Sequence, residues 1–184
     1  MRREMLILGL LRKENMHGYR LAEWIHHNLG DSAELKRPTA YFVLEKMTAC
    51  GLVTFADHQQ DHRPTKRVYS ITRQGELEFF RLLREALAAL PPNGFDVDVA
   101  LAFVMELPAD EAVELLTARS LAIENRLGQL QQAEGHTGPA GWMVEQQLRH
   151  YETERVWTHE LIQRIQANPW RPGENRIFQN SMTS

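Results

Sequence analysis

The sequence lacks the features that mark secreted and membrane proteins. Its 184 residues include a single cysteine, Cys50, so no internal disulfide framework can form. No stretch approaches the roughly eighteen consecutive apolar residues that a membrane span requires. The first residues, Met-Arg-Arg-Glu, lack the apolar core and the small-residue cleavage site of a signal peptide. We therefore expect a cytoplasmic protein with no membrane-spanning segment.

The sequence also lacks the motifs of catalysis. It contains no Gly-rich phosphate loop and no nucleophile elbow. Asp96 and Asp98 could suggest acid–base chemistry, but Asp96 is explained as the cap of a helix. His58, Asp61 and His62 have a spacing that could bind zinc, yet no further fixed ligand accompanies them. We expect polar loop residues there, and we predict neither an enzyme nor a bound metal or cofactor.

Net charge is small, at −3, but its distribution is uneven. Residues 1–73 hold 12 basic and 8 acidic residues, a balance of +4. Residues 74–184 hold 9 basic and 16 acidic residues, a balance of −7. This asymmetry indicates that the first part meets a polyanion while the second part has another role.

The first 90 residues have the pattern of a winged helix-turn-helix. Apolar residues recur at helical spacing in four segments, and two β-branched and aromatic segments flank a polar loop. The expected elements are helices over 4–14 and 17–29, a third helix from Pro38, strands over 52–56 and 66–71, and a fourth helix capped by Thr72 with Leu77, Phe80, Leu83 and Leu87 as its apolar positions. We predict a DNA-binding domain over residues 1–90 with a two-stranded wing.

The rest of the chain predicts helices only. Pro91-Pro92-Asn93-Gly94 breaks the pattern and marks the domain boundary. Long helices are expected over 109–133 and 142–167, so residues 95–167 form a helical dimerisation domain. Residues 168–184 show no period and are expected to be loose. The fold class is mainly α.

The third helix carries the main functional signal. Its inner face has Ala40, Leu44 and Met47, while Thr39, Phe42 and Lys46 fall on the outer face. A helix packed on one side and exposed on the other fits the major groove of DNA, where its first residues reach the base edges. The alternative is a solvated amphipathic helix. Basic residues that could neutralise phosphates precede this helix or lie on the hairpin: Lys36, Arg37, Arg63, Lys66 and Arg67.

Several segments resemble the PadR-type transcriptional regulators. HGYRLAEWI at 17–25, TAYFVLEKMTACGLV at 39–53 and KRVYSITRQG at 66–75 are similar to the family's N-terminal domain. DVDVALAFVMELPADEA at 96–112 and YETERVWTHELIQRI at 151–165 are similar to the C-terminal domain of its larger members. The resemblance implies a dimeric winged-helix repressor on a pseudo-palindromic operator. It also implies that Tyr41 contacts the DNA backbone and that Lys66, Arg67 and Tyr69 belong to the wing. Met16, Arg37-Pro38 and Ala40 depart from the family pattern. The departures at Met16 and Ala40 affect packing, whereas Arg37-Pro38 changes side chains next to the groove, so no known operator can be transferred.

The last helix offers two interpretations. Its apolar residues suit the core of a twofold dimer, which we favour. The aromatic residues Trp142, Tyr151 and Trp157 could instead line the pocket of a small planar aromatic effector, as in some relatives. The expected dimerisation residues are Val144, Leu148, Tyr151, Trp157, Leu161 and Ile165.

Together these patterns predict a homodimeric transcriptional regulator, a repressor, that binds double-stranded DNA with its third helix in the major groove and its wing on the backbone. One alternative is a winged-helix module that binds a protein partner. Another is a winged-helix regulator of a different family.

Overall fold

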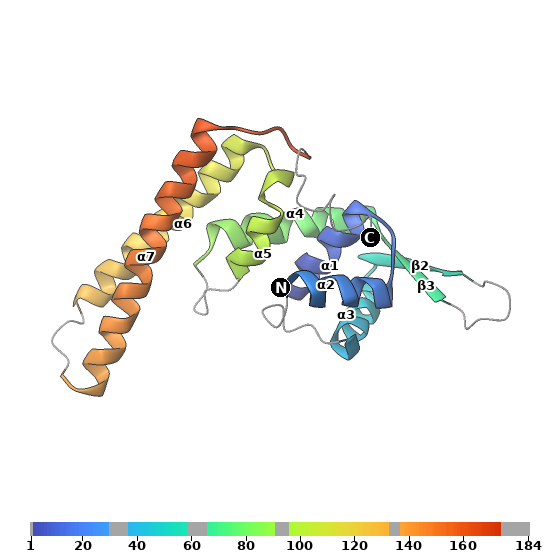
Figure 1. Cartoon of the computed structure of the whole chain (residues 1–184), viewed down its shortest axis with the longest axis horizontal. Helices are drawn as coiled ribbons and strands as arrows, with labels where there is room; N and C mark the ends of the chain where they lie inside the picture. The colour runs from blue at the N-terminus through green and yellow to red at the C-terminus, as the bar shows by residue number, and fades with distance from the viewer. Residues whose placement is uncertain (1, 30–36, 59–65, 91–95, 133–136, 174–184) are drawn as a thin grey trace. The chain divides into compact units, whose positions relative to one another are not determined.

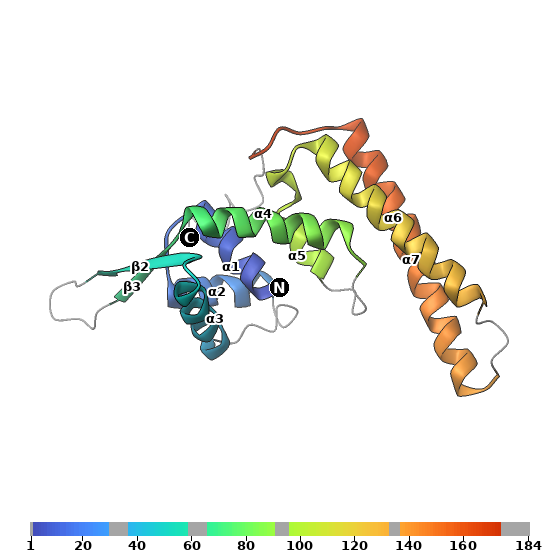
Figure 2. The ribbon, with the colours of Figure 1, turned by 180° about the vertical axis from the view of Figure 1, so that it is seen from behind.

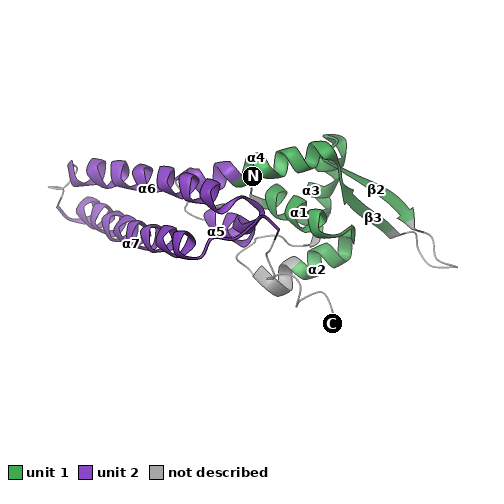
Figure 3. Cartoon of the chain, turned by 90° about the horizontal axis from the view of Figure 1, so that it is seen from above, with its two compact units in different colours: residues 1–83 green, residues 84–184 purple. Residues whose placement is uncertain are grey.

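A computed structural model describes residues 2–29, 37–58, 66–90, 96–132 and 137–173 of the chain. The chain divides into two compact units, Met1–Leu83 and Arg84–Ser184, and each is considered by itself (Figure 3). The division falls inside a helix that begins at Arg73, earlier than the predicted boundary at 91–94, which lies outside the described residues.

The first unit is a winged helix-turn-helix, as predicted (Figure 1). Three helices precede a β-hairpin, and a fourth helix follows it. Each predicted helix and strand is present, with ends that differ by at most two residues. The elements are α1 (Arg2–Lys13), β1 (Met16–His17), α2 (Gly18–Leu29), α3 (Arg37–Ala49), β2 (Val53–His58), β3 (Lys66–Ile71) and α4 (Arg73–Ala88).

The sheet has three strands where the sequence predicted two. β1 pairs with β3, antiparallel, with Met16 opposite Tyr69 and His17 opposite Val68. β2 pairs with the other edge of β3, so the strand order is β1-β3-β2. A two-residue strand shows no alternation that a sequence pattern can detect. Its effect is to hold the base of the wing beside the start of α2.

The core of the first unit is built around α1. This helix is buried on almost all sides, as its apolar sequence predicts, and the inner face of α3 packs in the same core. The helix α1 forms a core segment that fixes α3 and the sheet around it. The buried residues are Met5, Leu6, Ile7, Leu8, Leu10 and Leu11 of α1 and Ala40, Val43, Leu44 and Met47 of α3.

The helix α4 begins as predicted, and its predicted apolar positions Leu83 and Leu87 are buried, but its first turns pack differently. Thr72 caps it, since its Oγ1 accepts a hydrogen bond from the Gly75 N–H at 3.0 Å. Leu77, predicted as an apolar contact, is 67% exposed, whereas Phe79 is buried. The predicted set shared a helical spacing, but the packed face is one position out of phase at the start of the helix.

The second unit contains helices only within its described residues. They are α5 (Asp96–Ala102), a 3-10 turn η2 (Val104–Glu106), α6 (Ala109–Gln132) and α7 (Pro139–Ala167). α6 and α7 run antiparallel and lie side by side in opposite views (Figures 1 and 2). Two hydrogen bonds cross between them, from Arg126 to Gln147 and from Arg119 to Glu154.

Two residues at the start of the tail, which was expected to be loose, make hydrogen bonds to the rest of the second unit. The indole N–H of Trp170 donates to the Leu107 carbonyl at 3.0 Å, and the Gly173 N–H donates to the Met105 carbonyl at 3.1 Å. These bonds attach the segment after α7 to the end of η2. Residues 174–184 lie outside the described part of the chain. No helix in the described ranges is long and apolar enough to cross a membrane.

Candidate nucleic-acid interface

The helix α3 exposes two aromatic side chains. Phe42 is 67% exposed and Tyr41 is 41% exposed, while Ala40 and Leu44 on the opposite face are buried. Thr39, near the start of the helix, is half-buried. Large aromatic rings on the surface of a small domain indicate a binding surface rather than a packing face. Phe42 is exposed, as predicted for the outer face of α3. Thr39, predicted on the same face, is only partly accessible.

The lysine of the predicted outer face has a partner in its own unit. The Lys46 Nζ lies 3.6 Å from Glu4 Oε1 of α1, and the lysine side chain is mostly exposed. Arg37 begins α3, but its side chain is not described, and Lys36 lies outside the described residues. Lys46 is therefore the predicted cation on α3 for which the structure gives a geometry.

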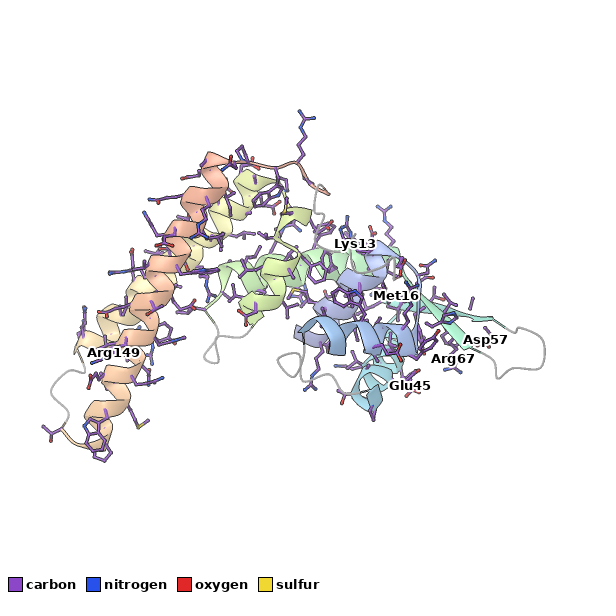
Figure 4. The ribbon with its side chains drawn as sticks, viewed as in Figure 1. Lys13, Met16, Glu45, Asp57, Arg67 and Arg149 are labelled. Carbon is purple, nitrogen blue, oxygen red and sulfur yellow. The ribbon has the colours of Figure 1, made fainter. Side chains whose placement is uncertain are left out.

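The wing presents one described cation, Arg67. Arg67 on β3 is directly opposite Asp57 on β2, and its Nε lies 3.7 Å from Asp57 Oδ1 (Figure 4). Its guanidinium carbon lies 4.3 Å from the ring centroid of Phe55, a cation–π distance. Lys66 begins β3, but its side chain is not described, and Arg63 lies outside the described residues. Arg67 is thus held on one face of the hairpin by two neighbours.

A surface hollow of about 250 Å³ lies between α3, β3 and the start of α2. It brings together residues from α3 and the wing that are far apart in the sequence. Tyr69, predicted as a DNA-contacting wing residue, is only 3% exposed, so its main role is to pack beneath the hollow. The lining residues are His17, Gly18, Tyr19, Tyr41, Glu45, Arg67 and Tyr69.

Gly18 makes the close packing at this hollow possible. A Cβ atom at Gly18 would lie 2.7 Å from Tyr41 Cε1 and 3.3 Å from Tyr69 Cε2. A larger residue at position 18 would therefore require the Tyr41 ring to shift, whereas its contact with the Tyr69 ring would be tight. The sequence analysis placed Gly18 in a motif but did not detect this role, because the contact joins three separate segments.

The hollow carries groups that suit a phosphate and one that opposes it. Arg67 is a cation, and the hydroxyls of Tyr19 and Tyr41 are hydrogen-bond donors. Glu45 contributes a carboxylate to the same lining, which would repel a phosphate that came close. The sequence analysis missed Tyr19, Glu45 and the partners of Arg67. The cross-strand position of Asp57 could have been found by aligning the two predicted strands about their loop.

The histidine pair considered for zinc is not placed by the structure. His58 ends β2 with its side chain undescribed, and Asp61 and His62 lie outside the described ranges. Among the described side chains no cluster of three or more histidine, cysteine or acidic residues could hold a metal ion.

The predicted dimerisation residues all lie on α7. All six are at most half-exposed in the single chain, and Ile165 is 3% exposed, so the chain itself already covers it. Trp142, Met143 and Val156 are the large apolar residues that α7 leaves exposed. Trp142 was considered both for the dimer core, which we favoured, and for an effector pocket, and the other two were not predicted. The half-exposed members are Val144, Leu148, Tyr151, Trp157 and Leu161.

Comparisons with known proteins match the first unit. Residues 7–81 match the Transcriptional regulator PadR-like family. Over 72 residues the chain is 35% identical to the Negative transcriptional regulator PadR of Bacillus subtilis (strain 168), a stretch that covers 39% of this chain and 40% of that protein. The chain therefore spans well under half of the curated relative that it matches.

Two solved structures of Bacillus subtilis PadR are similar over a longer stretch. The complex with operator DNA is 25% identical, with 88% of this chain and 98% of that chain covered and a TM-score of 0.44. The complex with p-coumaric acid is 22% identical, with 90% and 96% covered and a TM-score of 0.40. The family match covers residues 7–81. Within these residues the chain is similar to the PadR-like family of transcriptional regulators.

Proposed function

We propose that this chain is a homodimeric transcriptional repressor that acts in the cytoplasm and binds a pseudo-palindromic operator. In this proposal α3 enters the major groove and the wing contacts the sugar-phosphate backbone. The observation that carries it is the exposed pair Tyr41 and Phe42 on α3, next to a hollow that Tyr41 shares with Arg67 of the wing. These residues fall inside the family match, and the matched relative is named a negative regulator.

Each exposed side chain suits a different part of DNA. Phe42 offers an apolar surface to a thymine methyl group in the major groove. The Tyr41 hydroxyl and the Arg67 guanidinium can donate to phosphate oxygens, contacts that fix position without reading sequence. Thr39, half-buried near the start of α3, is within the part of a recognition helix that meets base edges. Specificity would therefore depend on Phe42 and Thr39, and affinity on Arg67.

Exposed apolar residues on α6 and α7 support the dimer. Leu121, Trp142, Met143 and Val156 are each more than half exposed in the single chain. A twofold pair of helical units would remove such residues from water. Two recognition helices then meet half-sites about 34–36 Å apart on one face of the duplex.

The aromatic effector is a weaker proposal. Bacillus subtilis PadR has a solved structure in complex with p-coumaric acid, which is a planar aromatic acid. In this chain Trp142 and Trp157 are separated by about 22 Å along α7 at 1.5 Å per residue. One small molecule cannot contact Trp142, Tyr151 and Trp157 of the same chain together. The dimer core remains our preferred role for these rings.

Fluorescence anisotropy on labelled duplexes tests the DNA proposal against the protein-interaction alternative. We expect Arg67→Ala to weaken binding to every sequence and to lower the slope of affinity against salt by about one unit per lost phosphate contact. The matched control is Arg149→Ala, an exposed arginine of α7 that pairs with Glu145 and should leave DNA binding unchanged. Absence of salt-dependent DNA binding by the unmodified chain would favour the protein-interaction module instead.

A further inference from the structure

The wing arginine is held by two neighbours of opposite character. Asp57 faces it across the hairpin, with Arg67 Nε 3.7 Å from the carboxylate oxygen. Phe55 is diagonal to it on the same face, with its ring 4.3 Å from the guanidinium. The carboxylate attracts by charge, whereas the ring holds the planar guanidinium by a contact that adds no net charge.

The carboxylate of Asp57 lies beside the guanidinium that a phosphate would contact, with its Oδ1 3.7 Å from Arg67 Nε. A guanidinium binds carboxylate and phosphate through the same N–H groups. Both Asp57 and Arg67 are half-exposed or more, so a phosphate can reach the pair from solvent. DNA must therefore displace Asp57 from Arg67 or bind beside an uncompensated carboxylate, and either event reduces affinity.

We propose that Asp57 is an intramolecular competitor for the phosphate site on Arg67, and that it limits the affinity of the wing for DNA of any sequence. This inference rests on the proposed function. Phe55 is the positioning residue in the same arrangement, because it keeps the guanidinium in place when DNA replaces the carboxylate. The two neighbours of Arg67 therefore have opposite effects on DNA binding.

Lys46 of α3 also has a carboxylate neighbour, Glu4 of α1. Lys46 Nζ lies 3.6 Å from the Glu4 carboxylate, so a second candidate phosphate contact also has a carboxylate beside it. Lysine is a flexible point charge, and no aromatic ring is recorded against Lys46 in the described residues. In the wing, substitution of Asp57 changes the charge beside Arg67, whereas substitution of Phe55 changes the contact that positions it.

The test measures anisotropy of a labelled duplex of mixed sequence with four versions of the full chain. We expect Asp57→Asn to raise affinity by about two- to five-fold at low salt, the range of one exposed ion pair. The gain should shrink as salt screens the charges. Phe55→Leu should lower affinity by a similar factor, because the guanidinium loses its ring contact. Glu78→Gln, which removes an equal charge from an ion pair with Arg81 on α4, is the control and should change little.

Each other outcome overturns a defined claim. Unchanged or weakened binding by the Asp57→Asn variant, next to DNA binding by the unmodified chain, overturns the inference alone. An equal gain with Glu78→Gln also overturns it, since net charge would then explain the effect. Absence of DNA binding by the unmodified chain overturns the proposed function and the inference together. Thermal melting of each variant checks that the fold is retained.

Discussion

The ring of Tyr41 on α3 closes over the backbone of Gly18, at the start of α2, so that a Cβ at Gly18 would lie 2.7 Å from Tyr41 Cε1. The contact joins the helix proposed to enter the major groove to the helix that precedes it. Because the ring is 41% exposed, it can move aside, whereas the buried Tyr69 below it has less freedom.

Replacement of Gly18 by alanine should therefore affect binding more than stability. We expect the free energy of unfolding to change by less than about 1 kcal/mol, because alanine favours the helix while the Tyr41 ring shifts. DNA affinity should fall, because the Tyr41 hydroxyl is displaced from its place beside the hollow. Chemical denaturation and anisotropy measured on one preparation separate the two effects. A variant that unfolds readily would show that the ring cannot move.

Gly75 should be much less tolerant of the same change. A Cβ at Gly75 would overlap the Leu52 carbonyl oxygen, a backbone atom that also accepts a hydrogen bond from the Thr72 N–H. We expect Gly75→Ala to destabilise the first unit by about 1–3 kcal/mol or more, as overpacking does. Gly128→Ala is the control, since nothing lies within 4 Å of the added Cβ in α6. Calorimetry should show a lower melting temperature for the first variant and an equal or higher one for the second.

A buried arginine stabilises the second unit. Arg119 is fully buried and donates to the Ala89 carbonyl at 2.6 Å and to Glu154 Oε2 at 3.0 Å. Removal of the Glu154 carboxylate leaves this cation without its charged partner. We expect Glu154→Ala to cost about 1–3 kcal/mol, while the exposed neighbour Glu152→Ala costs little. Urea denaturation followed by circular dichroism measures both; equal, small losses would contradict a stabilising role for this pair.

The ion pair on α4 predicts a dependence on pH. Two hydrogen bonds from the Arg81 guanidinium hold the pKa of Glu78 below its ordinary value of 4.5, against a smaller opposing effect of burial. A carboxyl with a lowered pKa in the folded state stabilises the protein above its unfolded pKa and loses that contribution as pH falls. The wild type should therefore exceed Glu78→Gln in stability by about 0.5 kcal/mol at pH 7, and this difference should shrink as pH falls through the lowered pKa of the folded state.

A double-mutant cycle controls this pH experiment. In an Arg81→Ala background, Glu78→Gln should have the same small effect at pH 7 and at pH 3. A pH-dependent difference that persists without Arg81 would show that another group lowers the pKa of Glu78.

The sequence was sufficient for the fold of the first unit because its helices and strands are defined by local periodicity. Periodicity also predicted the exposed position of Phe42 on α3 and the two long helices of the second unit. It failed at β1, where two residues form a strand only because β3 is nearby. It also failed at Leu77, where helical spacing alone did not determine which side of α4 meets the core.

The predicted site was incomplete for a related reason. Basic residues could be identified one by one, but their partners come from other segments. Asp57 and Phe55 restrain Arg67 through strand register, and Glu4 reaches Lys46 from α1. Tyr69 lies on the wing as predicted but is buried by its contact with the start of α2. Charge counts describe the attraction of the domain for DNA, whereas these contacts determine how much of each charge is accessible.

Selection of binding sites from a random duplex pool tests the central claim most directly. The full chain and its Phe42→Ala variant would be used in parallel. The proposal predicts that the full chain enriches an inverted repeat with half-sites about one helical turn apart, and that Phe42→Ala changes the preferred base at one position in each half-site at about 1–3 kcal/mol. Failure of the full chain to enrich any sequence, or the same enriched site with both proteins, would contradict recognition through Phe42 on α3.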